Sequence, residues 1–215
     1  MKKVILSFMT IALAAGSALA QFTTKDVFTK DEIVWYGIDF SKAKLIGQFA
    51  EGMGIGGEKK GNELKTKFIP AVNMAVVNSP KKYPLKEAMD KASVYFDIKA
   101  VEESNSKIDA DGLQSMNPSK LAKEDAEKVV ASYSVGDKKE GIAMVMVVEN
   151  YDKTNKVGTY WVVFFDIKTK SILFSEHVEG KPGLGNLNEY WAGTAAHVIK
   201  DMQKETWSQW KRKYK

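Results

Sequence analysis

Histidine and cysteine, the side chains most often used for acid–base, nucleophilic and metal chemistry, are scarce in this chain of 215 residues. It contains two histidines, His177 and His197, and no cysteine. Neither histidine stands in the H-x-x-x-H or H-E-x-x-H spacing that marks a zinc-binding helix. We therefore predict that both are surface or packing residues, and that elemental analysis will find no bound transition metal or haem. The absence of cysteine excludes disulfides and thiol catalysis.

A glycine-rich stretch matches a nucleotide-binding pattern in its letters. Residues 52–57 fit G-x-G-x-x-G. A dinucleotide site needs these glycines directly between a strand and a helix, with an acidic residue about 20 positions later. Here eleven residues separate Gly52 from Phe40, the end of the preceding predicted strand, and position 77 is Val77. We interpret 51–61 as a surface loop and predict no nucleotide cofactor.

The acidic residues do not form a site by their spacing. The run Asp109-Ala110-Asp111-Gly112 resembles part of a calcium loop, but the twelfth loop position, which requires a bidentate glutamate, is Pro118. We interpret the run as a polar turn. Glu102 and Glu103 are adjacent on a predicted strand end, so their side chains would point to opposite faces. We predict no catalytic residue, no metal ligand and no bound cofactor.

The end of the chain carries the most distinctive pattern. Trp207, Trp210 and Tyr214 recur at helical spacing among basic residues that include Arg212. A helix of about 26 residues is roughly 39 Å long, whereas a strand of about seven residues spans some 23 Å. The helix is expected to extend past the sheet, where these four residues would bind a partner protein or a membrane surface. In the alternative interpretation the rings pack at the sheet edge or against residues 21–32.

The first twenty residues have the three parts of a signal peptide. Lys2 and Lys3 precede an apolar run over 4–15, and Ala18-Leu19-Ala20 supplies the small residues at which signal peptidase cuts. The apolar run is too short to span a bilayer. We predict that this segment is removed, so that the mature chain begins at Gln21. The protein is expected to be periplasmic or secreted and, without cysteine, not a lipoprotein.

The mature chain is weakly basic. Without Lys2 and Lys3 it has 30 basic and 27 acidic side chains, a formal charge of +3. Arg212 is its one arginine. Specific reading of bases and phosphates relies on the planar fork of arginine, so we predict no nucleic-acid partner. A hydrophobic content of 44% excludes intrinsic disorder.

The remaining chain shows no repeat and no break in composition, so we predict one domain over 21–215. We predict a leader strand or loosely held arm over 21–32 and a surface loop over 103–119. The predicted strands, each rich in β-branched or aromatic residues, are 33–40, 94–100, 142–148, 159–165 and 171–178. The predicted helices begin at Asn62, after Pro84 and after Pro118, and a long last one has Asn188 as its N-cap.

This order of elements predicts the fold class. Strands separated by helices pair in parallel, whereas three successive strands joined by short turns are antiparallel. The expected fold is α/β (α+β), with a single mixed β-sheet. Its crossovers are parallel early in the chain, and an antiparallel three-strand meander follows late. Helices cover both faces, and a long helix ends the chain.

The segment 161–175, WVVFFDIKTKSILFS, resembles one group of periplasmic α/β domains. These are the N-terminal domain of the translocation protein TolB, the periplasmic domain of the curli-secretion channel, and the lipoprotein activators of penicillin-binding proteins. They share an apolar strand, an Asp-x-x-Thr-Gly-like turn, a second strand, a glycine loop and a long helix; here Lys170 replaces the usual glycine. The segment 35–44 is also similar to uncharacterised secreted proteins of Bacteroidota. The first resemblance implies an accessory or assembly role.

We therefore predict an exported, non-catalytic accessory or binding domain of the cell envelope that binds a protein partner. One alternative is a small-ligand carrier with a groove beside the loop 183–185, which an aromatic-lined pocket of several hundred cubic ångströms would favour. Another is an exported hydrolase, which a cluster of His177 or His197 with two carboxylates would favour. The oligomeric state stays open.

Overall fold

A computed structural model describes residues 21–49, 57–134 and 136–214. The predicted signal peptide and the glycines at 52–56 lie outside the described residues. Within the described ranges, no helix is both long and apolar enough to cross a membrane.

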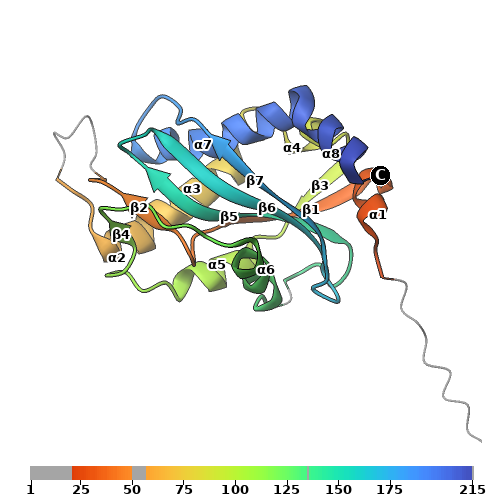
Figure 1. Ribbon diagram of the computed structural model, residues 1–215, viewed down its shortest axis with the longest axis horizontal. Helices are drawn as coiled ribbons and strands as arrows, with labels where there is room; N and C mark the ends of the chain where they lie inside the picture. Colours follow the sequence, from red (N-terminus) through yellow and green to blue (C-terminus); the bar gives the residue numbers. More distant parts are fainter. Residues whose placement is uncertain (1–20, 50–56, 135, 215) are drawn as a thin grey trace, which may run out of the picture.

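One mixed sheet of seven strands organises the fold (Figure 1). Its central strand, β5, pairs antiparallel with β6, which in turn pairs with β7. Along the other edge of β5, β1 and β2 lie end to end, both parallel to it. Beyond them β3 pairs with β1 and β4 pairs with β2, also in parallel. The strands are β1 (Glu32–Asp39), β2 (Lys44–Ile46), β3 (Ser93–Phe96), β4 (Gln114–Ser115), β5 (Ile142–Asp152), β6 (Val157–Asp166) and β7 (Ile172–Gly180).

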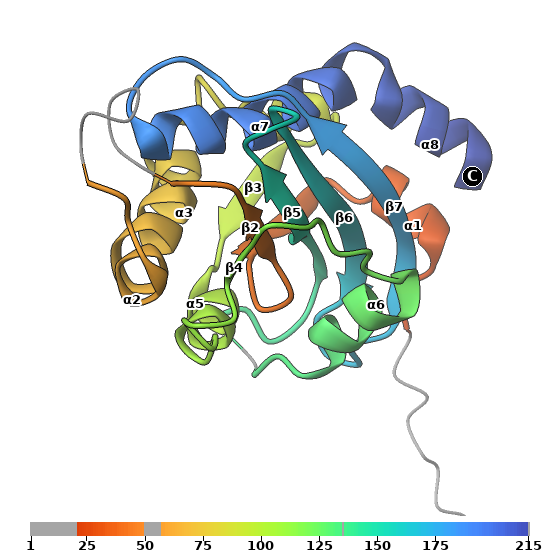
Figure 2. The same cartoon turned by 60° about the vertical axis from the view of Figure 1, so that its left-hand side comes forward.

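Helices cover both faces of this sheet, as Figure 2 shows. On one face α3, α4 and α7 pack on the larger core, with α1 and α8 at its end. On the other face α5 and α6 enclose a smaller core. The predicted fold class is therefore confirmed. The helices are α1 (Thr24–Thr29), α2 (Gly61–Glu63), η2 (Leu64–Phe68), α3 (Ile69–Asn78), α4 (Leu85–Ala88), α5 (Lys99–Ser106), α6 (Lys123–Ala131), α7 (Leu187–Asp201), η3 (Met202–Thr206) and α8 (Trp207–Tyr214), where η marks a π-helical turn.

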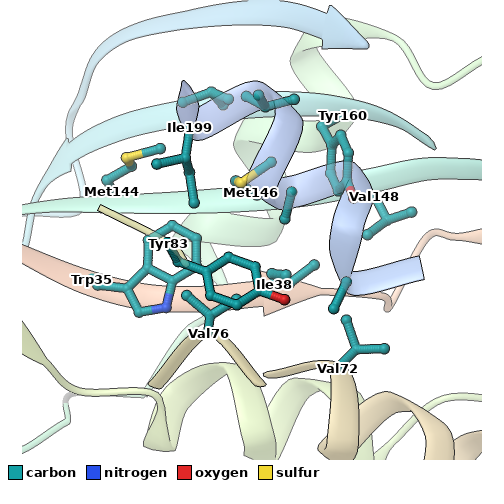
Figure 3. Packing of buried hydrophobic residues seen from close by; sticks show 14 of the residues in the cluster. Trp35, Ile38, Val72, Val76, Tyr83, Met144, Met146, Val148, Tyr160 and Ile199 are labelled. Atoms are coloured by element: carbon teal, nitrogen blue, oxygen red, sulfur yellow. The ribbon is translucent and has the colours of Figure 1, made fainter. Parts of the chain in front are cut away.

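The central strand β5 is buried on both faces, as its apolar sequence predicts. All eleven of its residues are buried. Met144, Met146 and Val148 face the larger core, where they meet α3 and α7 (Figure 3). Val145 and Val147 face α5 and α6. Since successive side chains of a strand point to opposite faces, such a strand has to be apolar at consecutive positions.

The helix predicted from Asn62 is confirmed, with a local adjustment at Pro70. Leu64, Phe68, Val72 and Val76 are all buried, as predicted from their spacing. Proline has no N–H and its ring clashes with the carbonyl of the preceding turn. The chain accommodates Pro70 by a π-helical turn, η2, in which the Ile69 amide reaches back five residues to the Leu64 carbonyl.

Two predictions about local structure are wrong. Residues 24–29 form helix α1 instead of a strand or loose arm, because Thr23 and Asp26 make a capping box and Phe28 packs against the core. The strand predicted over 94–100 ends at Phe96, and Lys99–Ser106 forms α5. The alternating apolar residues of 94–100 favour a longer strand. In the structure the last of them, Ala100, is on the buried side of α5.

The remaining differences are two short strands and the bounds of some helices. The sequence does not predict strand β2, and part of the predicted loop 103–119 belongs to α5 and β4. The last helix has Asn186 as its N-cap, two residues before the predicted Asn188, because the Asn186 side chain accepts the Glu189 amide.

Candidate functional site

The predicted aromatic surface at the end of the chain is part of the core. Trp207 and Trp210 are each only 5% exposed. The Trp207 ring lies 4.9 Å from Phe28 of α1 and 5.8 Å from Phe164 of β6. The prediction of an exposed stripe is therefore wrong for the two indoles, and the alternative, packing against 21–32, is confirmed. The physical reason is that Phe164 of β6 and Phe174 of β7 offer aromatic surface beneath α8, and Phe28 of α1 covers Trp207.

The two other predicted contact residues also lie on α8. Tyr214 stacks on Phe174 at 4.6 Å and donates its hydroxyl to Glu176 at 2.6 Å. That contact and partial burial raise the pKa of Tyr214, with burial the larger cause. Arg212 is exposed on the outer side of α8. A contact between Arg212 and a partner stays a prediction.

The histidines do not assemble a catalytic cluster. His177 Nε2 lies 2.7 Å from Glu149 Oε2, and the other Glu149 oxygen accepts the Leu121 amide at 2.6 Å. His197 faces Asp201 one turn along α7, at 3.2 Å. Each histidine thus meets one carboxylate instead of two. No group of three or more potential metal-ligating side chains forms among the residues that the structure describes.

The loop 183–185 offers no groove where it meets α7. The Gly183 amide donates to the Tyr190 carbonyl at 2.9 Å. A Cβ placed on Gly193 would lie 2.2 Å from the Gly183 nitrogen. The backbones of the loop and the helix are therefore in direct contact, which is possible because both residues are glycine. The ligand groove predicted at this place is not formed between Gly183 and α7.

A hollow of about 700 Å³ lies instead between α5 and α6. We call it the α5–α6 groove. Its floor is at the carboxyl end of β1, the side of a parallel sheet on which α/β proteins usually bind ligands. Its apolar surface comes from buried side chains, and serines add hydroxyls. The lining includes Ser41, Ala100, Ser104, Ile108, Leu121, Val129, Ser132, Tyr133 and Ser134.

A buried carboxylate stands under this floor. Asp39, the last residue of β1, is fully buried; its Oδ2 accepts the Tyr133 hydroxyl at 2.8 Å and its Oδ1 accepts the Ser41 amide at 2.7 Å. Burial, then the charge of Asp39, raises the pKa of Tyr133 well above its ordinary value. The Ser41 hydroxyl is buried and has no hydrogen-bond partner in the described structure. It is an unused polar group at the floor of the groove.

Two buried asparagines hold the end of β1 in this position. Asn73 of α3 accepts the Ile38 amide at 2.8 Å and donates to the Ile38 carbonyl at 2.9 Å. Asn105 of α5 accepts the Phe40 amide at 2.7 Å. These side chains take the place of a neighbouring strand, because β3 pairs with β1 only up to Trp35. The sequence analysis did not select either asparagine; a buried asparagine is recognisable only once its helix face is known.

The rim of the groove carries balanced charge. Lys107 pairs with Glu103 at 2.7 Å within α5, and Lys128 pairs with Asp125 at 2.8 Å within α6. These contacts lower the pKa of both carboxylates, mainly through the hydrogen bonds from the lysines. Lys42 and Asp109 complete the rim. Three positive and three negative side chains favour a neutral or zwitterionic occupant over a polyanion such as nucleic acid.

Replacing Tyr133 by phenylalanine tests how much the hydrogen bond between Tyr133 and Asp39 contributes to stability. The variant loses the donor to buried Asp39, and we expect the free energy of unfolding to fall by about 1–3 kcal/mol at neutral pH. The pKa of Tyr133 is raised in the folded protein. Its contribution is therefore present below the ordinary tyrosine pKa and is lost as the pH rises above it.

The measurement is urea unfolding of both proteins at about pH 8 and about pH 11, on either side of the ordinary tyrosine pKa. The difference between wild type and Tyr133→Phe should shrink at the higher pH. Tyr95→Phe is the matched control, since Tyr95 is 40% exposed. An equal effect of the two substitutions would show that the Tyr133–Asp39 bond contributes nothing to stability.

Comparison with known proteins adds no assignment. No family model matches this chain, and no curated protein matches it. The resemblance to periplasmic accessory domains therefore stays a prediction.

Proposed function

We propose that this protein is an exported, non-catalytic binding domain of the cell envelope that takes a polar segment of a partner protein into the α5–α6 groove. The observation that carries the proposal is the groove itself, with an unpartnered hydroxyl at its floor and a rim of balanced charge. A volume of about 700 Å³ lies within the range of ligand sites. A peptide segment supplies both the amide groups that would pair with the serine hydroxyls and side chains of either charge.

Export is part of the proposal and rests on the signal-peptide pattern of residues 1–20. The first contacts of the described chain begin just after the predicted cleavage point. The Phe22 amide donates to Asp166 at 3.3 Å, and Thr23 starts the capping box of α1. Removal of residues up to Ala20 would therefore leave these contacts intact. Mass spectrometry of protein recovered from outside the cytoplasm should find an N-terminus at Gln21.

The binding role is tested by photo-crosslinking in the organism that makes the protein. A photoreactive amino acid replaces Lys107 at the groove rim or, as control, Lys200 on the exposed side of α7. We expect a defined adduct from the groove position alone. A second substitution, Ser104→Trp, fills the groove and should abolish that adduct while the protein still melts as a folded domain.

Two results would overturn the proposal. Equal adducts from both positions would mean that the groove has no preferred partner. An adduct that survives Ser104→Trp would place the contact outside the groove. A membrane-surface partner would be recognised by an adduct with lipid in place of protein.

A further inference from the structure

A second hollow lies on the other side of α5 from the groove. It has a volume of about 330 Å³, is open to solvent on one side and is bordered by α5, the π-helical turn η2 and the start of α3. Ile69 and Pro70 give it an apolar wall. Its size is that of a small-molecule site, at the lower end of the usual range. We call it the η2–α5 pocket.

One buried side chain that lines this pocket has an N–H group to spare. Asn105 is 6% exposed, and its amide nitrogen donates to the Ile38 carbonyl at 3.1 Å. A carboxamide has two N–H groups, and the second one of Asn105 has no acceptor among the described residues. Because the Asn105 oxygen is held by the Phe40 amide, the side chain cannot turn away.

The π-helical turn leaves one backbone carbonyl without its helical donor. The Ile69 amide donates to the Leu64 carbonyl. The next residue, Pro70, has no N–H to donate. An amide at position 70 would donate to the Lys65 carbonyl in the π register or to the Thr66 carbonyl in the α register. Because Pro70 has no such amide, one of these two carbonyls lacks a helical donor. Both residues line the pocket. Such turns often occur at functional sites.

Two opposite charges face the pocket from different walls. Lys65 comes from η2 and Glu102 from α5. Neither residue takes part in an ion pair among those of the described structure. This separates them from their neighbours Glu103 and Lys107, which pair with each other at 2.7 Å. The pocket is thus bordered by half-buried Lys65 and exposed Glu102, and neither charge is paired within the described structure.

We propose that the η2–α5 pocket binds a free α-amino acid with an apolar side chain. The ligand carboxylate would meet Lys65 and the free amide hydrogen of Asn105. Its ammonium group would meet Glu102 and the unpaired carbonyl of the π-helical turn. Its side chain would pack on Ile69 and Pro70. A ligand with only negative charge would face Glu102 without compensation, and a polyamine would face Lys65 in the same way.

The test is calorimetric titration of the purified protein with L-valine, L-leucine and L-phenylalanine. We expect saturable binding of at least one of them with one site per chain. The analogues of that amino acid without the carboxylate or without the ammonium group should bind at least about tenfold more weakly, since each loses hydrogen bonds to a charged group. Binding of none of the three amino acids would overturn the proposal.

Two substitutions locate the site without touching buried contacts. Lys65→Gln and Glu102→Gln should each weaken binding by about tenfold or more. Glu103→Gln is the matched control, because it is the next residue along α5 but lines the groove instead. If Lys65→Gln and Glu102→Gln bind the amino acid as the wild type does, the η2–α5 pocket is not the binding site. The groove is a separate surface, so either result leaves the crosslinking experiment interpretable.

Discussion

The substitution Val145→Asp is expected to abolish folding. Val145 is fully buried in β5, between Gly37 of β1 and Val163 of β6. Its side chain faces the smaller core under α5 and α6. A carboxylate at this position would be buried without a cation or hydrogen-bond donor to compensate it, which costs several kcal/mol. That is comparable to the whole stability of a typical domain, about 5–15 kcal/mol.

Circular dichroism and thermal melting of the variant measure this effect. Ser93→Asp is the matched control, since it places the same carboxylate on an exposed position of edge strand β3. The control should lose no more than about 1 kcal/mol, because its new carboxylate is exposed and faces only the like charge of Glu32 on β1. If Val145→Asp melted within a few degrees of the wild type, β5 could not be an interior strand with both faces covered.

The second large effect is expected at the end of the chain, from Trp207→Ala. The Trp207 ring contacts Phe28, Phe164 and Trp210, and the Lys91 ammonium lies 5.4 Å from its centre. Truncating a buried aromatic residue to alanine costs about 3–5 kcal/mol. The loss should also loosen α1, whose contact with α8 runs through Phe28.

Denaturant unfolding of Trp207→Ala checks this expectation, with Arg212→Ala as the control on the exposed side of α8. The control should change the free energy of unfolding by no more than about 0.5 kcal/mol. Removal of the chain after Met202 should likewise destabilise the protein strongly. A truncated protein of unchanged stability would mean that the indoles do not belong to the core, and would restore the contact surface that their spacing predicted.

Much of the fold is predictable from local sequence because the apolar pattern of each strand indicates which faces of the sheet are buried. The run Ile142–Val148 is apolar at every position, and a strand of that kind needs cover on both faces. The short polar turn 166–170 between two predicted strands predicts the hairpin of β6 and β7. The helix from Asn62 was recognised from the period of its buried residues despite Pro70.

Local sequence was misleading where two elements share one apolar pattern. The alternation that ends at Ala100 is equally compatible with the end of a strand and the first turn of a helix. The choice of helix depends on β3 being a short edge strand, which only the pairing with β1 shows. The same limit applied to Trp207 and Trp210, whose spacing describes one face of a helix but not what covers it.

The sequence alone excluded disulfides and thiol catalysis and predicted an export signal. It also determined the order of the main strands and helices, and hence the mixed sheet. Tertiary structure decided where a ligand has room. The α5–α6 groove combines Ser41, Ser104 and Tyr133, and the η2–α5 pocket combines Lys65 with Glu102. These residues are far apart in the chain. No local periodicity predicts that these residues lie close together. Their proximity results from the crossovers that carry α3 and α5 to opposite faces of β1.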